Sequence, residues 1–317
     1  MRVIRQKLEG VDMVVDRLEC GPVRVTCIPD IANIAWPAKA IFGALSSDAL
    51  AAAETRAPSG TVNASDGTVR LSFNSYLIET PDFTALIDCG VGNDKERPDR
   101  PAWHRRSSSF LDALSALGVA RQQVDIVINT HLHADHVGWN TCLVEGVWQP
   151  TFASARYVVC GAELDHWSAI DRENDGVGPD GVGTLHGAFA DSIAPIVETV
   201  GYEAVAADAE IAPGLRFQPA PGHSPGMAAV ILSTPHGDVM FPADAIHHPL
   251  QLDDAAVSSN FCENPEQACS TRQRLLAQAA AGNSVLAPYH FPAPVFGRLK
   301  TEETSFRFCP LAVEDVS

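Results

Sequence analysis

The run His131-Leu132-His133-Ala134-Asp135-His136 concentrates the side chains of this sequence that are best suited to chemistry. It holds three imidazoles and one carboxylate as near neighbours, so little loop-closure entropy opposes their meeting at one point. The alternative is a polar loop whose histidines only form hydrogen bonds, but chance assembly of such a run is roughly a one in a thousand event. Imidazole and carboxylate ligands suit zinc, and manganese, cobalt, nickel or iron can occupy similar sites. The run therefore predicts a divalent-metal site.

A buried strand is predicted to deliver this run. Residues Val124 to Asn129 include the apolar run Ile126-Val127-Ile128 and lead directly into His131, as expected of a buried strand that ends at a functional loop. Before it, Ser109 to Leu117 has helical periodicity and ends at Gly118. A hairpin is expected about Pro81-Asp82, between strands at 75–79 and 84–88.

The same alternation of elements continues along the chain. Further strands are predicted at 23–28, 155–160, 215–217, 228–233, 238–241 and 284–287, and further helices at 162–170 and 267–281. This order favours an α/β protein with sheets sandwiched between helices. No repeat, low-complexity tract or linker divides the chain, so one domain is expected over residues 1–317. Residues 1–65 form either an N-terminal extension packed on the sheet or a lid, with a helix at 47–55 capped by Ser47.

Composition narrows the classes of partner. The net charge of −17 would repel nucleic acid and anionic lipid, so neither is an expected partner and a small neutral substrate is favoured. No apolar run approaches the roughly 20 residues that cross a bilayer, and the first residues lack the apolar core of a secretory signal. The eight cysteines include no Cys-x-x-Cys pair, which suits reduced thiols. A cytoplasmic location is expected.

Further landmarks accompany the histidine run in a recognisable order. They are Asp88 in Leu86-Ile87-Asp88-Cys89-Gly90, His223 in Pro221-Gly222-His223-Ser224-Pro225-Gly226, Asp244 in Pro242-Ala243-Asp244, and His290 in Tyr289-His290-Phe291. Together with the histidine run these make five landmarks, and with them the sequence, from about Ser75 to His290, resembles the metallo-β-lactamase fold superfamily. The resemblance implies an αββα sandwich, in which two mixed β-sheets are flanked by helices.

The resemblance also implies a ligand set for two divalent metal ions, with zinc as the expected metal. His131, His133 and His223 would hold one ion. Asp135, His136 and His290 would hold the other, and Asp244 would bridge the two. Asp88 in this family supports the site by orienting a histidine ligand. Taken singly, His223 could instead be a turn residue, His290 a core histidine and Asp244 a helix cap.

The expected reaction follows from two adjacent cations, which lower the pKa of a bridging water and provide a hydroxide nucleophile. Asp135 or Asp244 could hold the hydroxide and pass its proton to the leaving group. Within the superfamily, the bridging aspartate disfavours zinc β-lactamases, and the acidic chain disfavours nucleases. The sequence most resembles acyl-homoserine-lactone lactonases and methyl-parathion-hydrolase-like enzymes. A lactonase or carboxylic esterase is therefore expected, with phosphotriester hydrolysis as the alternative.

One position departs from the lactonase pattern. Such enzymes often carry a tyrosine three residues after the bridging aspartate, where this chain has His247, followed by His248. We expect either that His247 assists catalysis as an electrophile or proton donor, or that both histidines face solvent. Apolar residues that could line the substrate pocket are Trp139, Phe73, Trp148 and Phe261, although each could equally belong to the core.

Two other classes of function remain open at the level of sequence. Mononuclear-iron members of the superfamily oxidise sulfur substrates, but these do not need a second complete metal site. A binding protein that keeps the fold without turnover is disfavoured by the intact ligand set. The resemblance also suggests a homodimer. The histidines outside the landmarks, His104, His166, His186 and His236, are expected to be structural or exposed.

Overall fold

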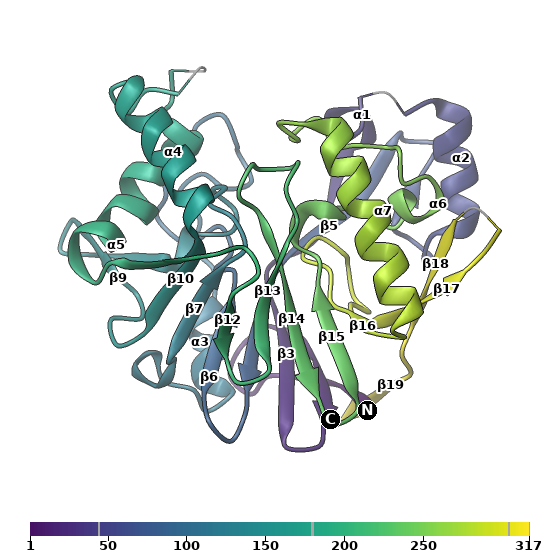
Figure 1. Cartoon of the computed structure of the whole chain (residues 1–317), viewed down its shortest axis with the longest axis horizontal. Helices are drawn as coiled ribbons and strands as arrows, with labels where there is room; N and C mark the ends of the chain where they lie inside the picture. Colours follow the sequence, from purple (N-terminus) through teal and green to yellow (C-terminus); the bar gives the residue numbers. More distant parts are fainter. Residues whose placement is uncertain (44, 179–180, 304, 317) are drawn as a thin grey trace. The chain divides into compact units, whose positions relative to one another are not determined.

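The computed structural model describes residues 1–43, 45–178, 181–303 and 305–316 (Figure 1). The chain forms two compact units, and each is assembled from segments that are distant in the sequence. Unit 1 comprises Met1–Val3, Ile31–Ser72 and Ala207–Glu314, whereas unit 2 comprises Ile4–Asp30, Phe73–Ala206 and the residues from Asp315 on. No linker marks these boundaries, and the expectation of one domain over residues 1–317 stays a prediction.

A mixed ten-stranded sheet has the order β11-β10-β7-β6-β5-β3-β2-β1-β19, with β4 paired to β5. Its strands are β1 (Arg2–Lys7), β2 (Val14–Cys20), β3 (Val23–Pro37), β4 (Val62–Asn63), β5 (Thr68–Glu79), β6 (Thr84–Ile87), β7 (Ile126–Asn129), β10 (Arg156–Cys160), β11 (Tyr202–Val205) and β19 (Val313–Val316). The predicted hairpin is confirmed, since β5 and β6 pair antiparallel. Thr80 Oγ1 accepts hydrogen bonds from two backbone N–H groups of the turn, those of Asp82 and Phe83.

Strand β7 occupies the position predicted for the strand that delivers the histidine run. It pairs in parallel with both β6 and β10, and all four of its residues are buried. Such a strand is covered on both faces, which explains its continuous apolar sequence. The core of unit 2 includes Leu77, Leu86, Val127 and Phe110.

Helices and short elements complete unit 2. They are α3 (Phe110–Ala116), η1 (Arg121–Gln123), η2 (Gly138–Asn140), α4 (Gly161–Glu173), η3 (Thr184–Gly187), η4 (Phe189–Ile193), α5 (Ala194–Thr199) and the separate hairpin of β8 (Thr141–Val144) and β9 (Val147–Pro150). Helix α3 ends as predicted, because Gly118 follows it with a φ of 82°, a backbone conformation that favours glycine. Helix α4 is longer than the predicted 162–170.

Unit 1 contains a seven-stranded sheet of order β12-β13-β14-β15-β16-β17-β18. Its strands are β12 (Glu210–Ala212), β13 (Leu215–Pro219), β14 (Ala228–Thr234), β15 (Gly237–Phe241), β16 (Val285–Leu286), β17 (Gly297–Thr301) and β18 (Phe306–Pro310). Helix α7 (Pro265–Ala281) covers one face of this sheet, where Leu275, Leu276 and Ala279 join Ile231 and Met240 in one apolar cluster (Figure 1). The predicted helix at 267–281 is thus confirmed, and Asn264 caps its N-terminus.

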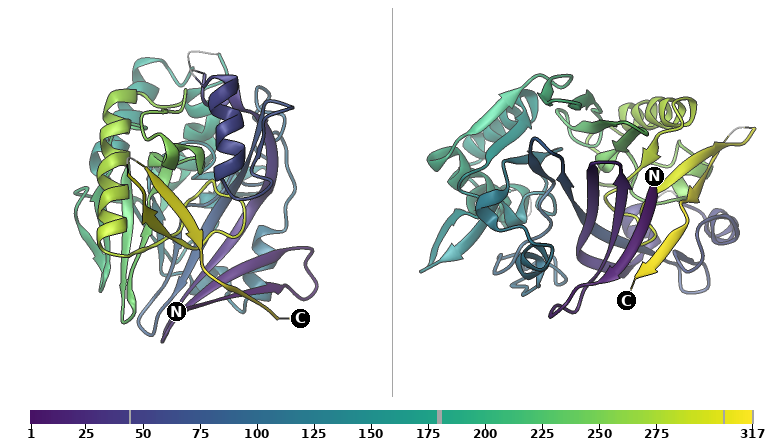
Figure 2. Two further views of the ribbon diagram at one scale, coloured as in Figure 1. Left: turned by 90° about the vertical axis from the view of Figure 1, so that its right-hand side faces the viewer. Right: turned by 90° about the horizontal axis from the view of Figure 1, so that it is seen from below.

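Residues 38–71 add a smaller apolar cluster to unit 1. Helices α1 (Ala38–Ile41) and α2 (Ser47–Arg56) contribute to it together with α6 (Leu250–Asp253), whereas η5 (Ala243–Ala245) belongs to the apolar cluster of helix α7. Helix α2 lies close to β17 and β18, where Arg56 pairs with Glu302 (Figure 2). The predicted cap was wrong by one residue: Ser46, not Ser47, accepts the Ala49 N–H. The choice between a lid and an extension stays a prediction.

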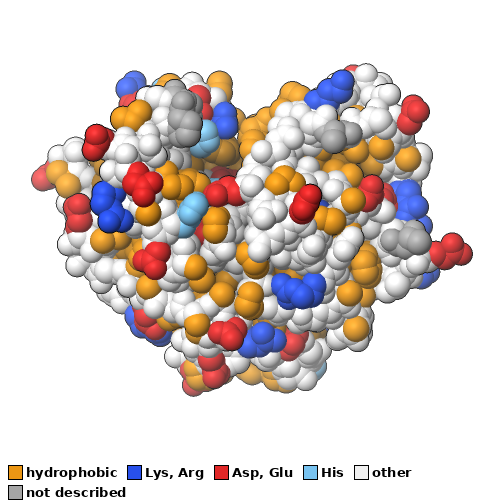
Figure 3. Space-filling view, turned by 45° about the horizontal axis from the view of Figure 1, so that its top comes forward, with side chains coloured by type: hydrophobic (Ala, Val, Ile, Leu, Met, Phe, Trp, Pro, Cys, Tyr) orange, Lys and Arg blue, Asp and Glu red, His pale blue; other side chains and the backbone are white. Residues whose placement is uncertain are grey.

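The helices, the surface charges and the cysteines can be compared with what the composition predicts. No described helix is long and apolar enough to cross a membrane. The face drawn in Figure 3 carries acidic and basic side chains interspersed with apolar ones. All eight cysteines are free thiols.

Candidate metal centre

The histidine run of unit 2 forms a compact loop directly after β7. The ring centroids of His131 and His136 lie 4.0 Å apart, and those of His131 and His133 lie 4.6 Å apart. The loop closes on itself because the His136 N–H donates to the His133 carbonyl oxygen at 2.9 Å. Asp135 Oδ2 lies 3.7 Å from His136 Nε2. The four predicted ligands of this run therefore gather in one place, and His131 and His136 are fully buried.

Asp88 holds this loop from the end of β6. Its Oδ1 accepts the Thr130 N–H and its Oδ2 accepts the Thr130 hydroxyl, both at 2.8 Å. The same Oδ2 lies 2.8 Å from His136 Nδ1, so the opposite ring nitrogen, Nε2, is left for a metal. Burial raises the pKa of the Asp88 carboxyl, and the interaction with His136 opposes that rise. The contact between Asp88 and a histidine is the one that the family resemblance implies.

A second carboxylate supports the loop from helix α4. Glu163 Oε1 accepts the Leu132 N–H at 3.1 Å and the Trp167 indole N–H at 2.7 Å. The Trp167 ring meets the His133 ring edge-on, with 5.6 Å between centroids. Sequence reasoning missed both residues, because no motif distinguishes them from other helical Glu and Trp residues.

The predicted ligands of unit 1 converge on a single oxygen atom. Asp244 Oδ2 lies 3.3 Å from His223 Nε2 and 3.2 Å from His290 Nε2. It also lies 3.2 Å from the Nε2 of His247, and the atoms of His223, Asp244 and His247 are close enough to hold one metal ion. All four side chains are buried. The three landmarks that the sequence placed far apart are thus brought together.

Three separate loops deliver these side chains. His223 follows β13, Asp244 lies in the short turn after β15, and His290 follows β16. Each of these loops follows the end of a strand, and loops that a rigid scaffold positions often carry binding residues. His290 is fixed by two bonds to Ser72: its Nδ1 lies 3.0 Å from the Ser72 carbonyl oxygen, and its own carbonyl accepts the Ser72 N–H at 2.9 Å.

The His223 loop is held against the start of helix α7. Gly222 has a φ of 130°, and a Cβ placed there would lie 2.2 Å from the Ala268 nitrogen, so only glycine fits. The Asn264 N–H donates to the Gly222 carbonyl at 2.9 Å, and the Glu263 N–H donates to the His223 carbonyl at 3.1 Å. The backbone of Glu263 and Asn264 therefore fixes the backbone of the loop that carries His223.

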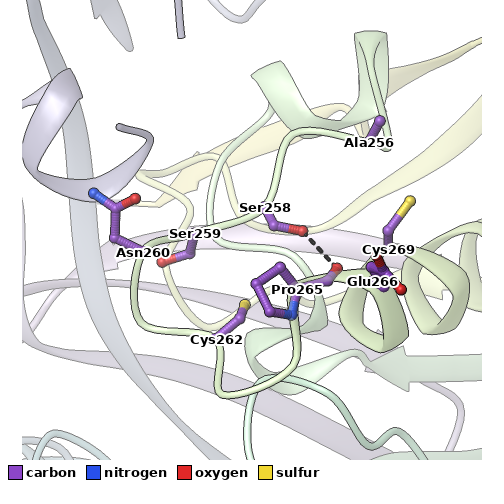
Figure 4. A pocket seen from close by; sticks show the side chains of 8 residues that line it. All are labelled: Ala256, Ser258, Ser259, Asn260, Cys262, Pro265, Glu266 and Cys269. Carbon is purple, nitrogen blue, oxygen red and sulfur yellow. Dashed lines mark hydrogen bonds between the residues drawn. The ribbon is translucent and has the colours of Figure 1, made fainter. Parts of the chain in front are cut away.

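Cys262 contacts that ring directly. Its Sγ lies 3.7 Å from His223 Nδ1, and burial raises the pKa of this thiol to about 11, so it stays protonated at neutral pH. Cys262 also lines a pocket of about 670 Å³, in which Ser258 donates a hydrogen bond to the Pro265 carbonyl (Figure 4). Sequence reasoning treated Cys262 as structural, and no Cys-containing motif marked it as a neighbour of a ligand.

His247 and His248 do not face solvent, so that alternative was wrong: both are buried. Both ring nitrogens of His248 contact backbone groups. Its Nδ1 accepts the Leu250 N–H at 3.1 Å, and its Nε2 lies 3.1 Å from the Thr61 carbonyl oxygen. Burial lowers the pKa of His248 to about 4. His247 instead stacks on His290, with 5.4 Å between parallel rings, and belongs to the Asp244 cluster.

The four candidates for the substrate pocket lie in different settings. Trp139 is buried in the core of unit 2, stacked on Phe110 at 5.5 Å, and its indole N–H donates to Asp30. Phe73 is also buried and meets Trp103 edge-on. The Lys95 ammonium lies over the Trp148 ring, 3.6 Å from its centroid, and Phe261 is exposed. Core contacts therefore account for Trp139 and Phe73, and their role in a pocket stays a prediction.

The remaining histidines have partners away from the ligand sets. His104 accepts the Arg97 N–H, His166 contacts the Trp167 ring, and His186 Nδ1 lies 2.7 Å from Asp99. His236 is exposed in the turn between β14 and β15. These positions agree with the expectation that the four are structural or exposed.

The donor chemistry of the Asp244 cluster fits a divalent cation. If His290 Nδ1 donates its hydrogen to Ser72, the Nε2 lone pair points toward Asp244 Oδ2. Several lone pairs directed at one carboxylate oxygen repel one another unless a proton or a cation lies among them. Imidazole nitrogen and carboxylate oxygen are ligands that zinc prefers. The residues present therefore fit the metal that the resemblance implies.

Comparisons with known proteins identify the family. The family model "Metallo-beta-lactamase superfamily" matches residues 70–290. The N-acyl homoserine lactonase AiiA of Bacillus thuringiensis subsp. kurstaki is 24% identical over 213 residues, which cover 63% of this chain and 73% of that protein. A protein of Mycobacterium tuberculosis named "Probable metallo-hydrolase" is 29% identical over 203 residues, covering 61% of this chain and 62% of its own length.

Solved structures show the same fold. The hydrolase AbOPH of the β-lactamase superfamily has a TM-score of 0.77 at 22% identity, covering 94% of this chain and 98% of that chain. AidC, a dizinc quorum-quenching lactonase, has a TM-score of 0.75 at 18% identity, covering 94% and 97%. The predicted fold class is thus confirmed. The chain belongs to the metallo-β-lactamase superfamily and is a metal-dependent hydrolase of that superfamily.

Proposed function

We propose that the chain hydrolyses a small neutral lactone or carboxylic ester with two divalent metal ions, zinc being the metal expected. In this proposal two groups of ligands, each holding one ion, form a single centre. His131, His133 and His223 hold one ion, Asp135, His136 and His290 hold the other, and Asp244 bridges them. The match to the family model supports this combination, because residues 70–290 include every one of these ligands.

The single observation that carries the proposal is the convergence on Asp244. One carboxylate oxygen has three imidazole Nε2 atoms within 3.3 Å, all of them buried. A bridging carboxylate must offer its oxygen to metal ions that other ligands also reach, and Asp244 is surrounded in this way. A substrate class is suggested by relatives whose names describe N-acyl homoserine lactonases and by the dizinc lactonase AidC.

The bound cations would supply a hydroxide nucleophile near neutral pH and polarise the oxygen of the scissile group. Asp135 or Asp244 would hold the proton of the nucleophile and later pass it to the leaving oxygen. In this proposal His247 donates a hydrogen bond to the carbonyl oxygen of the substrate: its Nε2 lies 3.2 Å from Asp244 Oδ2 in the same cluster, and its Nδ1 has no hydrogen-bond partner among the described residues. Asp88 keeps the His136 ring in place throughout.

The test is a panel of lactones, aryl esters and aryl phosphotriesters assayed on the zinc and manganese forms. Asp244→Asn is the negative control. We expect about two zinc ions per chain and the highest kcat/KM on a lactone or ester. The highest activity on a phosphotriester would support the alternative function, phosphotriester hydrolysis, which the same residues could catalyse. A content of one iron per chain, together with oxygen uptake, would indicate sulfur oxidation instead of hydrolysis and would overturn the proposal.

The role of His247 has its own test. Replacing it with Ala should lower kcat/KM on the best substrate by about 10²-fold, the cost of losing one donor to a developing oxyanion. Unchanged kcat/KM would remove His247 from the mechanism. The homodimer and the cytoplasmic location stay predictions, which sedimentation and cell fractionation would test.

A further inference from the structure

Helix α7 carries a fully buried arginine, Arg272, that forms no ion pair within the described residues. The other fully buried arginine of the described chain, Arg97, binds the Asp191 carboxylate through two nitrogens. A buried cation is costly unless other groups replace the water that it has lost. Burial accordingly lowers the pKa of the Arg272 guanidinium. The hydrogen bonds that Arg272 does form therefore indicate its role.

The guanidinium of Arg272 binds two backbone carbonyl groups of unit 1. Its Nε donates to the Ala245 carbonyl oxygen at 2.7 Å, and its Nη1 donates to the Ala255 carbonyl oxygen at 2.5 Å. Ala245 directly follows Asp244, and Ala255 begins the loop of residues 255–264. One rigid, planar group thus joins the turn that carries the proposed bridging carboxylate to this second loop.

The loop of residues 255–264 and the residue before Arg272 both hold the His223 loop. Glu263 and Asn264 donate their N–H groups to that loop, as described above. Thr271 Oγ1 donates to the Pro221 carbonyl oxygen at 2.7 Å, two residues before His223. Because residues 271 and 272 are consecutive in a regular helix, the separation between their backbones is fixed. Helix α7 therefore sets the position of the His223 loop relative to the Asp244 turn.

Helix α7 is itself held firmly, which such a role requires. It covers one face of the seven-stranded sheet, and Leu275, Leu276 and Ala279 are buried in the apolar cluster there (Figure 1). At its other end the backbone of Ala268 lies against Gly222, where no Cβ would fit. A helix packed at both ends cannot slide without disturbing the sheet. The two carbonyl bonds of Arg272 therefore start from a fixed point.

We propose that Arg272 is a positioning residue that holds the Asp244 turn in place relative to the His223 loop. It acts through backbone carbonyl groups. This inference rests on the proposed function and deepens it, because it assigns the group that fixes the geometry of the dispersed ligands of unit 1. The position should require arginine, since a lysine ammonium cannot present two N–H groups in one plane at the same spacing.

The first experiment compares Arg272→Met with the unmodified protein after both are loaded with the same number of cobalt(II) ions. Methionine keeps an unbranched side chain but removes every N–H donor. The visible absorption bands of cobalt(II), which depend on ligand geometry, should change in the variant. On the best substrate, kcat should fall by about tenfold or more while KM changes less, because displaced ligands alter the reacting centre.

A second readout uses no metal. In the metal-free protein, amide hydrogen exchange at residues 243–247 and 255–264 should be faster in Arg272→Met than in the unmodified chain, while exchange in strand β14 stays the same. Arg272→Lys keeps the charge and should restore part of the cobalt bands and of kcat. It also provides the comparison where Arg272→Met fails to fold, which the melting temperature of each variant reveals.

Arg274→Met is the matched control. Arg274 lies on the same helix, is exposed, and donates to the Pro219 carbonyl in strand β13. Its removal should leave the cobalt bands and kcat unchanged. An equal change in this variant, or unchanged bands and exchange in Arg272→Met, would overturn the inference while the proposed function stands. If the unmodified chain binds no cobalt, the proposed function and the inference fail together.

Discussion

The two groups of proposed metal ligands, one in each unit, are built in different ways. In unit 2 the ligands come from one short loop, and the surrounding carboxylates of Asp88 and Glu163 hold that loop through its backbone and one ring. In unit 1 each ligand comes from its own loop, and the set meets at the single oxygen of Asp244. A contiguous loop can be stabilised by its neighbours, whereas a dispersed set depends on the placement of each strand end. The first arrangement should therefore tolerate the loss of one residue better than the second.

The largest effect is expected at the point of convergence. Asp244→Asn removes the charge shared by three imidazoles, and we expect kcat/KM to fall by about 10³-fold or more, with fewer than two metal ions retained per chain. Asp135→Asn, in the contiguous loop, should retain more metal. Elemental analysis and steady-state kinetics measure both variants. Equal metal loss in the two would contradict the contrast between the sets.

The outer carboxylate of unit 2 should matter less than a ligand. Asp88→Asn keeps an oxygen for Thr130 but weakens the contact with His136, and metal affinity should fall by about 10- to 100-fold. Competition with a chelator gives the affinity. Asp88→Glu, which keeps the charge but lengthens the side chain, is the companion variant. Metal affinity equal to that of the unmodified chain would show that the loop needs no such support.

The comparable neighbour in unit 1 is a neutral thiol. Cys262→Ala removes the contact with His223 Nδ1 but leaves the two backbone bonds from Glu263 and Asn264, so the loss of metal affinity should be only a few-fold. Cys269→Ala, in the same pocket, is the matched control and should change nothing. A loss as large as that of Asp88→Asn would mean that the thiol, and not the backbone, positions His223.

A last prediction concerns the stability of unit 2 and not its affinity for metal. Lys95 is fully buried, donates to Thr141 Oγ1 at 2.6 Å and lies 3.5 Å from Asp191. Burial lowers the pKa of Lys95 from 10.5 to about 7, against the attraction of Asp191. Unfolding therefore favours protonation: the contribution of Lys95 to stability is present above pH 10.5 and is lost as the pH falls toward about 7.

Lys95→Met removes this dependence. The unfolding free energy of the unmodified chain, relative to the variant, should decline between pH 10 and 7 by up to about 1.4 kcal/mol per pH unit and then level off. Denaturant unfolding at several pH values measures the difference. A constant difference over this range would show that Lys95 keeps its ordinary pKa.

The two units also differ in how much of each could be predicted from the sequence. The loop of unit 2 was predictable because strand β7 is continuously apolar and the ligands follow it without interruption. His223, Asp244 and His290 carry no such local signal, and only their order and the family resemblance linked them to one site. His247 shows the limit most clearly, because the sequence left a catalytic role and exposure to solvent equally open, and only the fold shows that both adjacent histidines are buried.

Other features depended on tertiary contacts that leave no local pattern. The burial of Glu163 in α4 is decided by the position of the metal loop, not by helical periodicity. Gly222 reads as an ordinary turn glycine, although its backbone lies against the start of helix α7. The C-terminal strands β17 and β18 have mixed, weakly alternating sequences and were not predicted.

The apolar cluster around helix α1 has a consequence for synthesis. Gly43 donates its N–H to Asn260, and these residues are 217 positions apart in the chain. At about 5 to 20 residues per second, a ribosome needs roughly 10 to 40 s to make the partner of a segment it has already released. During that interval Ile41, Phe42 and Leu50 lack the partner Leu250. Nascent chains should therefore need protection from aggregation at their N-terminal end, and slower translation should lower the soluble yield unless a chaperone is present.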